Sequence, residues 1–133
     1  MGYGDAMRPI VLIVEDDEIL RLLTVEAISL LDVWVLACIN ADEALEILES
    51  SASIALVVTD VTMPGSMDGL ELSKMIWTRW PSVPVIITSG KPLLTAVSLP
   101  SHALFLSKPC PLDLLLESVD RYLRHQPKAC PEP

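Results

Sequence analysis

Short apolar runs recur along the chain, separated by stretches of mixed polarity. Each run is continuous rather than alternating, which is typical of parallel strands that are buried on both faces of a sheet. The runs are IVLIV at 10–14, VWVLACI at 33–39, IALVV at 54–58, VPVIIT at 83–88 and ALFL at 103–106. The pattern therefore predicts five buried strands.

Amphipathic helical patterns lie between most of these runs. The segment 17–31 has apolar side chains at a period of about 3.6 residues, which predicts a helix with one buried face. Its apolar side chains are Ile19, Leu20, Leu23, Ala27, Ile28 and Leu31. Asn40 and Glu43 have the types and the spacing of a helix N-cap and the third residue after it. The segments 68–80 and 111–124 are also amphipathic, and a proline follows each of them.

Strands and helices alternate in this order, which predicts a doubly wound α/β sheet with right-handed crossovers and helices on both faces. The connection between the fourth and fifth runs departs from the pattern. Only the segment LLTAVSL lies between Pro92 and Pro100. Proline is tolerated in the first turn of a helix but not in its interior. The fourth helix is therefore expected to be short or irregular, with fewer than three turns between Lys91 and Ser101.

The composition is that of a single globular domain. Hydrophobic residues make up 51% of the chain, which allows one sizeable core. The domain is expected to span residues 9–125, with flexible termini at 1–8 and 126–133. The formal net charge of −9 argues against nucleic acid, which is bound by Lys and Arg, and against an anionic membrane surface.

We expect no membrane span and no export signal. No apolar stretch approaches the roughly 20 residues of a membrane span, and acidic residues follow the first run too soon for a signal peptide. Cys38, Cys110 and Cys130 are odd in number and scattered, which fits a reducing compartment better than a disulfide framework or a zinc site. A cytoplasmic protein is therefore expected.

Polar side chains of complementary kinds follow four of the predicted strands. Glu15 and Asp16 follow the first, Asp60 ends the third, Thr88 and Ser89 end the fourth, and Lys108 follows the fifth. In a doubly wound sheet, ligands bind at the carboxyl ends of the strands. Carboxylates there suit Mg²⁺, while a hydroxyl and an ammonium group suit the oxygens of a phosphoryl group. The set predicts a site for Mg²⁺ and a phosphoryl group.

Each of these residues has an ordinary structural interpretation when it is taken alone. Acidic residues at a helix start usually only complement the helix dipole. Asp60 could cap the turn that follows it, and Lys108 could be a solvated surface lysine. Their common position decides between the interpretations. All of them stand at predicted strand ends, and none of the strand interiors carries a charge.

Four motifs contain these residues, namely LIVEDD, VVTDVTMPGSMDGLEL, VPVIITSG and FLSKP. In identity, order and spacing they resemble the receiver domain of the two-component response regulators, and the resemblance covers residues 9–125. It implies a flavodoxin-like fold with strand order 2-1-3-4-5. It also implies a stand-alone, phosphorylation-dependent switch or a phosphorelay protein of bacterial signalling.

The resemblance assigns separate roles to the acidic residues. It implies that Asp60 is the phosphoacceptor. Mg²⁺ is implied to bind Asp16 and Asp60 directly, Glu15 through a water molecule, and the backbone carbonyl of Thr62.

The resemblance also assigns the contacts of the phosphoryl group. Thr88 is implied to form a hydrogen bond with that group, Lys108 to pair with it and the backbone of Ser89 to contact it. Thr88 and Phe105 are implied to form the conformational switch. The peptide bond between Lys108 and Pro109 is implied to be cis, which a proline at this position permits.

The chain departs from the family pattern in two places. The loop MPGSMDG is one residue longer than the usual loop after the acceptor, and the stretch from Thr88 to Lys108 is short. Neither departure removes a residue of the predicted chemistry. Both concern the loops around it, and the second concerns the surface of the fourth helix.

The implied phosphodonor is a sensor histidine kinase or a histidine phosphotransfer protein. The readout is then an unidentified downstream protein, a homodimer or phosphate relay itself. Such a domain promotes its own phosphorylation and dephosphorylation and is not expected to be a turnover enzyme. Two alternatives stay open, a degenerate receiver that binds proteins constitutively and a haloacid-dehalogenase-type phosphatase. The phosphatase is disfavoured because it needs a second aspartate where Thr62 stands.

Overall fold

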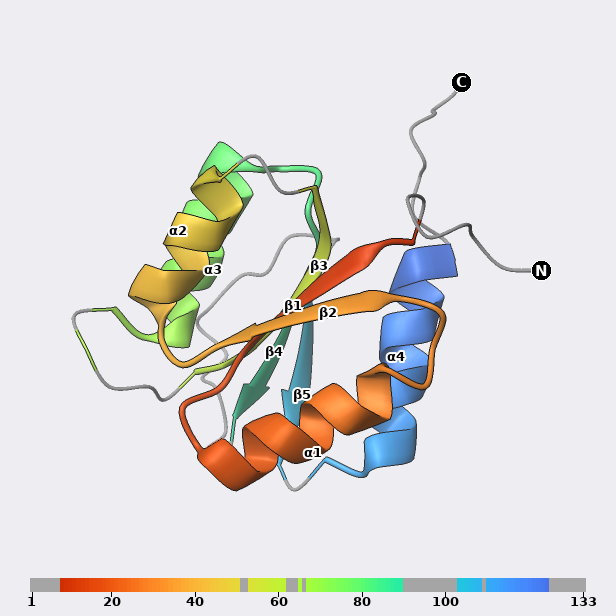
Figure 1. The fold of residues 1–133 in the computed structure, drawn as a ribbon. Helices are drawn as coiled ribbons and strands as arrows, with labels where there is room; N and C mark the ends of the chain where they lie inside the picture. Colours follow the sequence, from red (N-terminus) through yellow and green to blue (C-terminus); the bar gives the residue numbers. More distant parts are fainter. Residues whose placement is uncertain are drawn as a thin grey trace.

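A five-stranded parallel sheet forms the centre of the structure, and helices cover both of its faces (Figure 1). The computed structural model describes residues 8–50, 53–61, 65, 67–89, 103–108 and 110–124. The strand order is β2-β1-β3-β4-β5, and each neighbouring pair is parallel. The strands are β1 (Ile10–Val14), β2 (Trp34–Cys38), β3 (Ile54–Asp60), β4 (Val85–Ser89) and β5 (Ala103–Ser107). The predicted fold class and strand order are confirmed.

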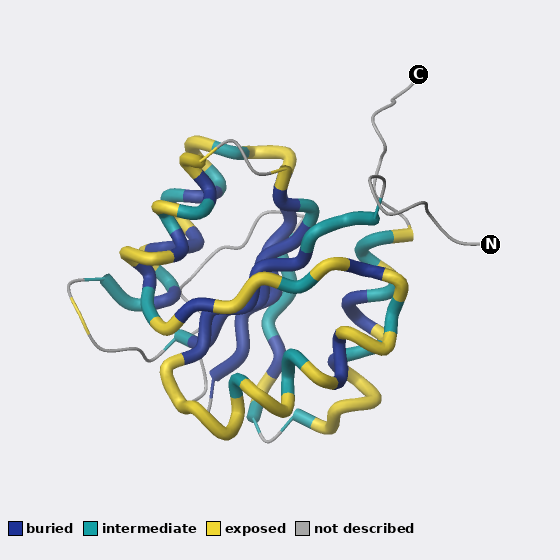
Figure 2. Tube along the Cα trace, in the orientation of Figure 1, coloured by how far each residue is buried: buried dark blue, intermediate teal, exposed yellow. Residues whose placement is uncertain are grey.

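Burial of the strands follows their place in the sheet. The three inner strands, β1, β3 and β4, are buried along almost their whole length, as their continuous apolar runs predicted. The prediction was wrong for the two edge strands. In β2, Trp34 and Leu36 are partly exposed, and in β5 only Leu106 is buried. Figure 2 shows the buried segments gathered in the inner strands.

Four helices lie in the described part of the chain. They are α1 (Glu18–Ile28), α2 (Ala41–Glu49), α3 (Gly69–Arg79) and α4 (Leu112–Arg124). The N-cap side chains of Asp17, Asn40 and Asp68 each accept a hydrogen bond from the amide three residues later, which fixes where the first three helices begin. The start of α2 predicted at Asn40 is therefore confirmed, and Asp68 with Glu71 forms a complete capping box.

The helices form two layers. Side chains of α1 and α4 pack on one face of the sheet, around Ile28, Leu115 and Val119. Side chains of α2 and α3 pack on the other face, around Leu48 and Ile76. Successive residues of β1 alternate between the two clusters, as the pleat of a strand requires. Figure 1 shows the same two-layer arrangement.

Helix α1 differs from its sequence prediction. It ends at Ile28, three residues before the predicted boundary, and its buried residues are Ala27 and Ile28. Ile19, Leu20 and Leu23, which the period placed on the buried face, are exposed, and Ile19 keeps 70% of its surface accessible. The first two turns of α1 therefore present apolar side chains to solvent.

Several sequence predictions fall outside the described residues. They concern the short fourth helix between Lys91 and Ser101, the cis bond before Pro109 and the two termini. These stay predictions, and α4 of the structure is the helix that was predicted at 111–124. Within the part of the chain that the structure describes, no helix is long and apolar enough to cross a membrane.

Candidate metal and phosphoryl site

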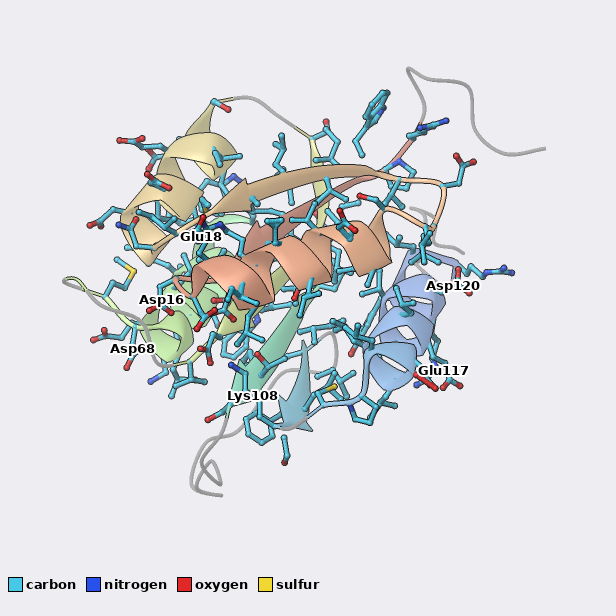
Figure 3. All side chains as sticks on the ribbon, turned by 60° about the horizontal axis from the view of Figure 1, so that its bottom comes forward. Asp16, Glu18, Asp68, Lys108, Glu117 and Asp120 are labelled. Carbon is cyan, nitrogen blue, oxygen red and sulfur yellow. The ribbon has the colours of Figure 1, made fainter. Side chains whose placement is uncertain are left out.

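The predicted polar residues come together at the carboxyl edge of the sheet. Asp60 is the last residue of β3 and pairs in register with Thr88 of β4. Lys108 follows β5, and its amide donates a hydrogen bond of 2.7 Å to the carbonyl of Ser89. Figure 3 shows Asp16 and Lys108 at this same end of the sheet. Strand pairing alone therefore brings together residues that are far apart in the sequence.

Three carboxylates form a cluster at this edge. Glu15, Asp16 and Asp60 each place one carboxylate oxygen within 4.8 Å of the others. Carboxylate oxygens are ligands that Mg²⁺ prefers, so the residues present suit this ion. Glu15 and Asp60 are buried while Asp16 is exposed, which leaves the cluster open on one side. Thr62, whose carbonyl was predicted as a further ligand, lies outside the described residues.

Lys108 supplies a positive charge to this cluster. Its Nζ lies 3.2 Å from Oδ2 of Asp60 and 3.8 Å from Oε1 of Glu15. The ammonium group is therefore held directly over the predicted phosphoacceptor. It is also close enough to contact a group bound to that carboxylate.

The electrostatic state of Glu15 follows from its position. Burial raises the pKa of the Glu15 carboxyl above its ordinary value, and the charges of Asp60 and Asp16 act in the same direction. The hydrogen bond from the Asp17 amide and the charge of Lys108 lower the pKa and offset part of this effect. A cation bound at the cluster would favour the ionised form of Glu15.

Thr88 and Ser89 lie on β4, and Phe105 lies on the neighbouring strand β5. Thr88 and Ser89 are buried at the end of β4. The Thr88 hydroxyl lies 3.5 Å from the carbonyl of Thr59, a distance at which it is only weakly held. Phe105 pairs in register with Ile87 and packs partly buried against the cluster on the α2 and α3 face. Their roles in phosphoryl binding and switching stay predictions.

The sequence profile of the response regulator receiver domain matches residues 11–120. The chain belongs to this family. The DNA-binding transcriptional regulator NtrC of Escherichia coli K12 is 37% identical to it over 123 residues, which cover 89% of this chain and 25% of NtrC. The chain therefore spans about a quarter of the length of this relative. The sensor protein TorS of Escherichia coli K12 is 27% identical and is matched over 92% of this chain and 13% of TorS.

Solved structures agree with the family assignment. A response regulator receiver protein from Sinorhizobium medicae WSM419 superposes with a TM-score of 0.83 and 25% identity, over 91% of this chain and 98% of that protein. A receiver domain protein from Methanospirillum hungatei JF-1 superposes equally well, with 26% identity over 92% of this chain and 99% of that one. This receiver domain therefore has the fold of its family as well as its sequence motifs.

Two residues next to the site were not predicted from the sequence. Arg21 of α1 reaches back to the loop that carries Glu15 and Asp16. Gly69, the first residue of α3, lies against the backbone that carries Asp60. Neither contact follows from a periodic pattern, but a glycine at the first helical position is a signal for close backbone approach.

We expect Gly69→Ala to destabilise the receiver domain. A Cβ atom at Gly69 would lie 1.9 Å from the carbonyl oxygen of Asp60 and 2.9 Å from Cα of Val61, so α3 or the end of β3 must move. Such overpacking typically costs about 1–3 kcal/mol of unfolding free energy. Urea denaturation measures the effect. Lys74→Ala, an alanine substitution at an exposed position of α3, is the control and is expected to stay within about 0.5 kcal/mol. A wild-type midpoint for Gly69→Ala would contradict the close approach.

An apolar cavity of about 570 Å³ opens beside the acids, between the starts of α1 and α4. Its walls include Leu20 and Leu23 from α1 and Leu112 and Leu115 from α4. Several apolar side chains near the starts of α1 and α4 are exposed. We call the exposed set the apolar ridge, and it consists of Ile19, Leu20, Leu22, Leu23, Leu112 and Leu114. Exposed apolar patches of this kind typically mark protein interaction sites.

Proposed function

We propose that this receiver domain is a phosphorylation-dependent switch or relay protein in which Asp60 accepts a phosphoryl group. The observation that carries the proposal is the ammonium group of Lys108, which lies 3.2 Å from the Asp60 carboxylate at the edge of an acidic cluster. A carboxylate nucleophile, a cluster of hard oxygen ligands and one fixed cation are the parts that phosphoryl transfer to an aspartate needs.

In the proposed reaction, the Asp60 carboxylate attacks the phosphorus of a phosphohistidine on a partner protein. The bond from phosphorus to the imidazole nitrogen breaks, and its electron pair stays on the imidazole. The product on this chain is an acyl phosphate. Asp16 and Asp60, with Glu15 through a water molecule and the carbonyl of Thr62, would hold Mg²⁺. When bound, Mg²⁺ supplies positive charge that offsets the charge on the phosphoryl oxygens.

The chain's own groups position the phosphoryl oxygens. Lys108 is close enough to pass from the Asp60 carboxylate to an oxygen of the group bound there. The Thr88 hydroxyl and the backbone of Ser89 stand on the neighbouring strand and complete the contacts. Sheet pairing holds the backbone of Thr88 and Ser89 in place before the reaction, so only side chains need to move.

Phosphorylation is proposed to shift the population between two arrangements of the β4–β5 surface. Thr88 moves toward the phosphoryl group, since its present hydrogen bond is long at 3.5 Å. Thr88 pairs with Leu106 of β5, and Phe105 is the residue before Leu106. The Phe105 side chain then moves inward. The changed surface then binds a downstream protein or a second copy of the domain.

The phosphodonor is proposed to be a sensor histidine kinase or a histidine phosphotransfer protein. The apolar ridge supports a protein donor, because its members Leu20, Leu23 and Leu112 line the same cavity as Asp60 and so give a partner an apolar surface near the reacting atoms. The net charge of −9 argues against contact with nucleic acid, and the scattered cysteines support the proposed location in the cytoplasm. We do not expect turnover of external substrates.

Incubation with acetyl phosphate or with a phosphorylated histidine phosphotransfer protein, followed by mass spectrometry, tests this function. We expect one phosphoryl group to be added in a reaction that requires Mg²⁺, and we expect peptide mapping to place it on Asp60. Catalytic hydrolysis of phosphate esters would instead support a phosphatase. Inertness toward both donors would support a degenerate receiver that only binds proteins.

A further inference from the structure

Arg21 makes an unusual contact from the second turn of α1. Its guanidinium Nη1 donates a hydrogen bond of 3.0 Å to the backbone carbonyl of Glu15 and lies 3.5 Å from that of Asp16. Both neighbours of Arg21 on the helix, Leu20 and Leu22, are exposed, whereas Arg21 itself is half-buried. The side chain therefore turns back from the helix onto the loop between β1 and α1.

This loop carries two of the three clustered carboxylates in consecutive positions. One end is fixed to the sheet, because the amide of Glu15 donates a hydrogen bond of 3.1 Å to the carbonyl of Cys38. The other end is fixed by the cap of α1, where Asp17 accepts from the amide of Leu20. Between them, Arg21 is the side chain that holds the carbonyls of the ligand-bearing residues.

We propose that Arg21 is a positioning residue for the metal site, which holds the loop so that the Glu15 and Asp16 carboxylates face Asp60. The inference rests on the proposed function, since it takes the acidic cluster to be a Mg²⁺ site. The hydrogen bonds of Arg21 described above go to backbone carbonyls and not to carboxylate oxygens. Arg21 acts through the backbone, as outer groups that orient metal ligands commonly do.

Charge and positioning predict opposite effects when Arg21 is replaced. The guanidinium is a positive charge close to the cluster, so its removal should tighten Mg²⁺ binding if charge alone mattered. If Arg21 positions the ligands, its removal should weaken binding, typically by about 10–100-fold for groups of this kind. The sign of the change in the Mg²⁺ dissociation constant therefore separates the two explanations.

The test compares Arg21→Met, Arg21→Lys and the wild type by isothermal titration with Mg²⁺ at fixed ionic strength. We expect Arg21→Met to bind Mg²⁺ at least about 10-fold more weakly. Arg21→Lys, which keeps the charge and one donor group, is expected to fall between the two. Arg124→Met is the matched control, because it removes the same charge from the far end of α4, where Arg124 pairs with Asp120.

A second measurement needs no metal. Hydrogen exchange of the Asp17 amide, which donates to Oε2 of Glu15 at 3.0 Å, is expected to be faster in metal-free Arg21→Met than in the wild type. Equal or tighter Mg²⁺ binding by Arg21→Met, beside a wild type that binds Mg²⁺, would overturn this inference alone. A wild type that binds no Mg²⁺ would overturn the proposed metal site, and the inference with it.

Discussion

Asp60→Asn is expected to take up no phosphoryl group from either donor while keeping the fold of the domain. The amide is nearly the same size as the carboxylate, but it is neutral and is a poor nucleophile. The substitution removes the 3.2 Å contact with Lys108, and the lysine keeps Glu15 as a partner at 3.8 Å. The buried site therefore loses one negative charge, and Lys108 still has Glu15 as an acidic partner.

Mass spectrometry after incubation with acetyl phosphate and Mg²⁺ measures this outcome, and circular dichroism checks the fold. Glu117→Gln is the matched control, because Glu117 is exposed in the middle of α4 and lies away from Lys108 (Figure 3). It also removes one negative charge and is expected to be phosphorylated like the wild type. Wild-type labelling of Asp60→Asn would show that another residue is the acceptor.

The site could be predicted from the sequence because a parallel sheet brings the carboxyl ends of its strands to one edge. Continuous apolar runs predicted the strands. The polar residues at the end of each run were therefore expected at the carboxyl edge of the sheet. Asp60 and Thr88 end two neighbouring strands, Lys108 directly follows a third, and the three residues lie together at one edge of the sheet. The capping residues were equally local signals, and Asn40 begins α2 as predicted.

The burial of α1 could not be predicted from its period. At about 100° per residue, the apolar residues between Ile19 and Ile28 are spread around the whole helix circumference, so no single face can bury them all. The sequence period selects one face only when the other face is polar. Here α1 buries its last turn, and the first turns remain exposed as part of the apolar ridge.

The contacts of Arg21 and Gly69 have a different origin. Each joins segments whose distance is set by the assembled sheet and helices rather than by a repeat in the sequence. Arg21 reaches six residues back along the chain to Glu15, and Gly69 meets the backbone of Asp60 and Val61 at the end of another element. Both residues lie next to the site and contact only its backbone. A sequence search for chemically reactive residue types therefore did not find them.

Saturating Mg²⁺ is expected to raise the melting temperature of the wild type by roughly 10 °C. Mg²⁺ binds the clustered acids of the folded state and not the dispersed acids of the unfolded chain, so it stabilises by mass action. At about 100 times the dissociation constant this amounts to roughly 2.7 kcal/mol, and each kcal/mol shifts the melting point of a domain of this size by about 3–5 °C. Thermal melting in chelator and in Mg²⁺, at fixed ionic strength, measures the shift.

Asp16→Asn is expected to lose most of this shift and to melt no lower than the wild type in chelator. Asp16 is exposed and has no ion pair with Lys108 among the described contacts, so its charge mainly repels the two buried acids. The melting temperature of Asp60→Asn in chelator is less informative. This substitution removes the repulsion between Asp60 and the other two acids, but it also removes the ion pair with Lys108. Glu117→Gln is expected to keep the full shift. If Asp16→Asn also keeps the full shift, Mg²⁺ binds at a different site. The proposal that Arg21 positions the metal ligands would then be wrong as well.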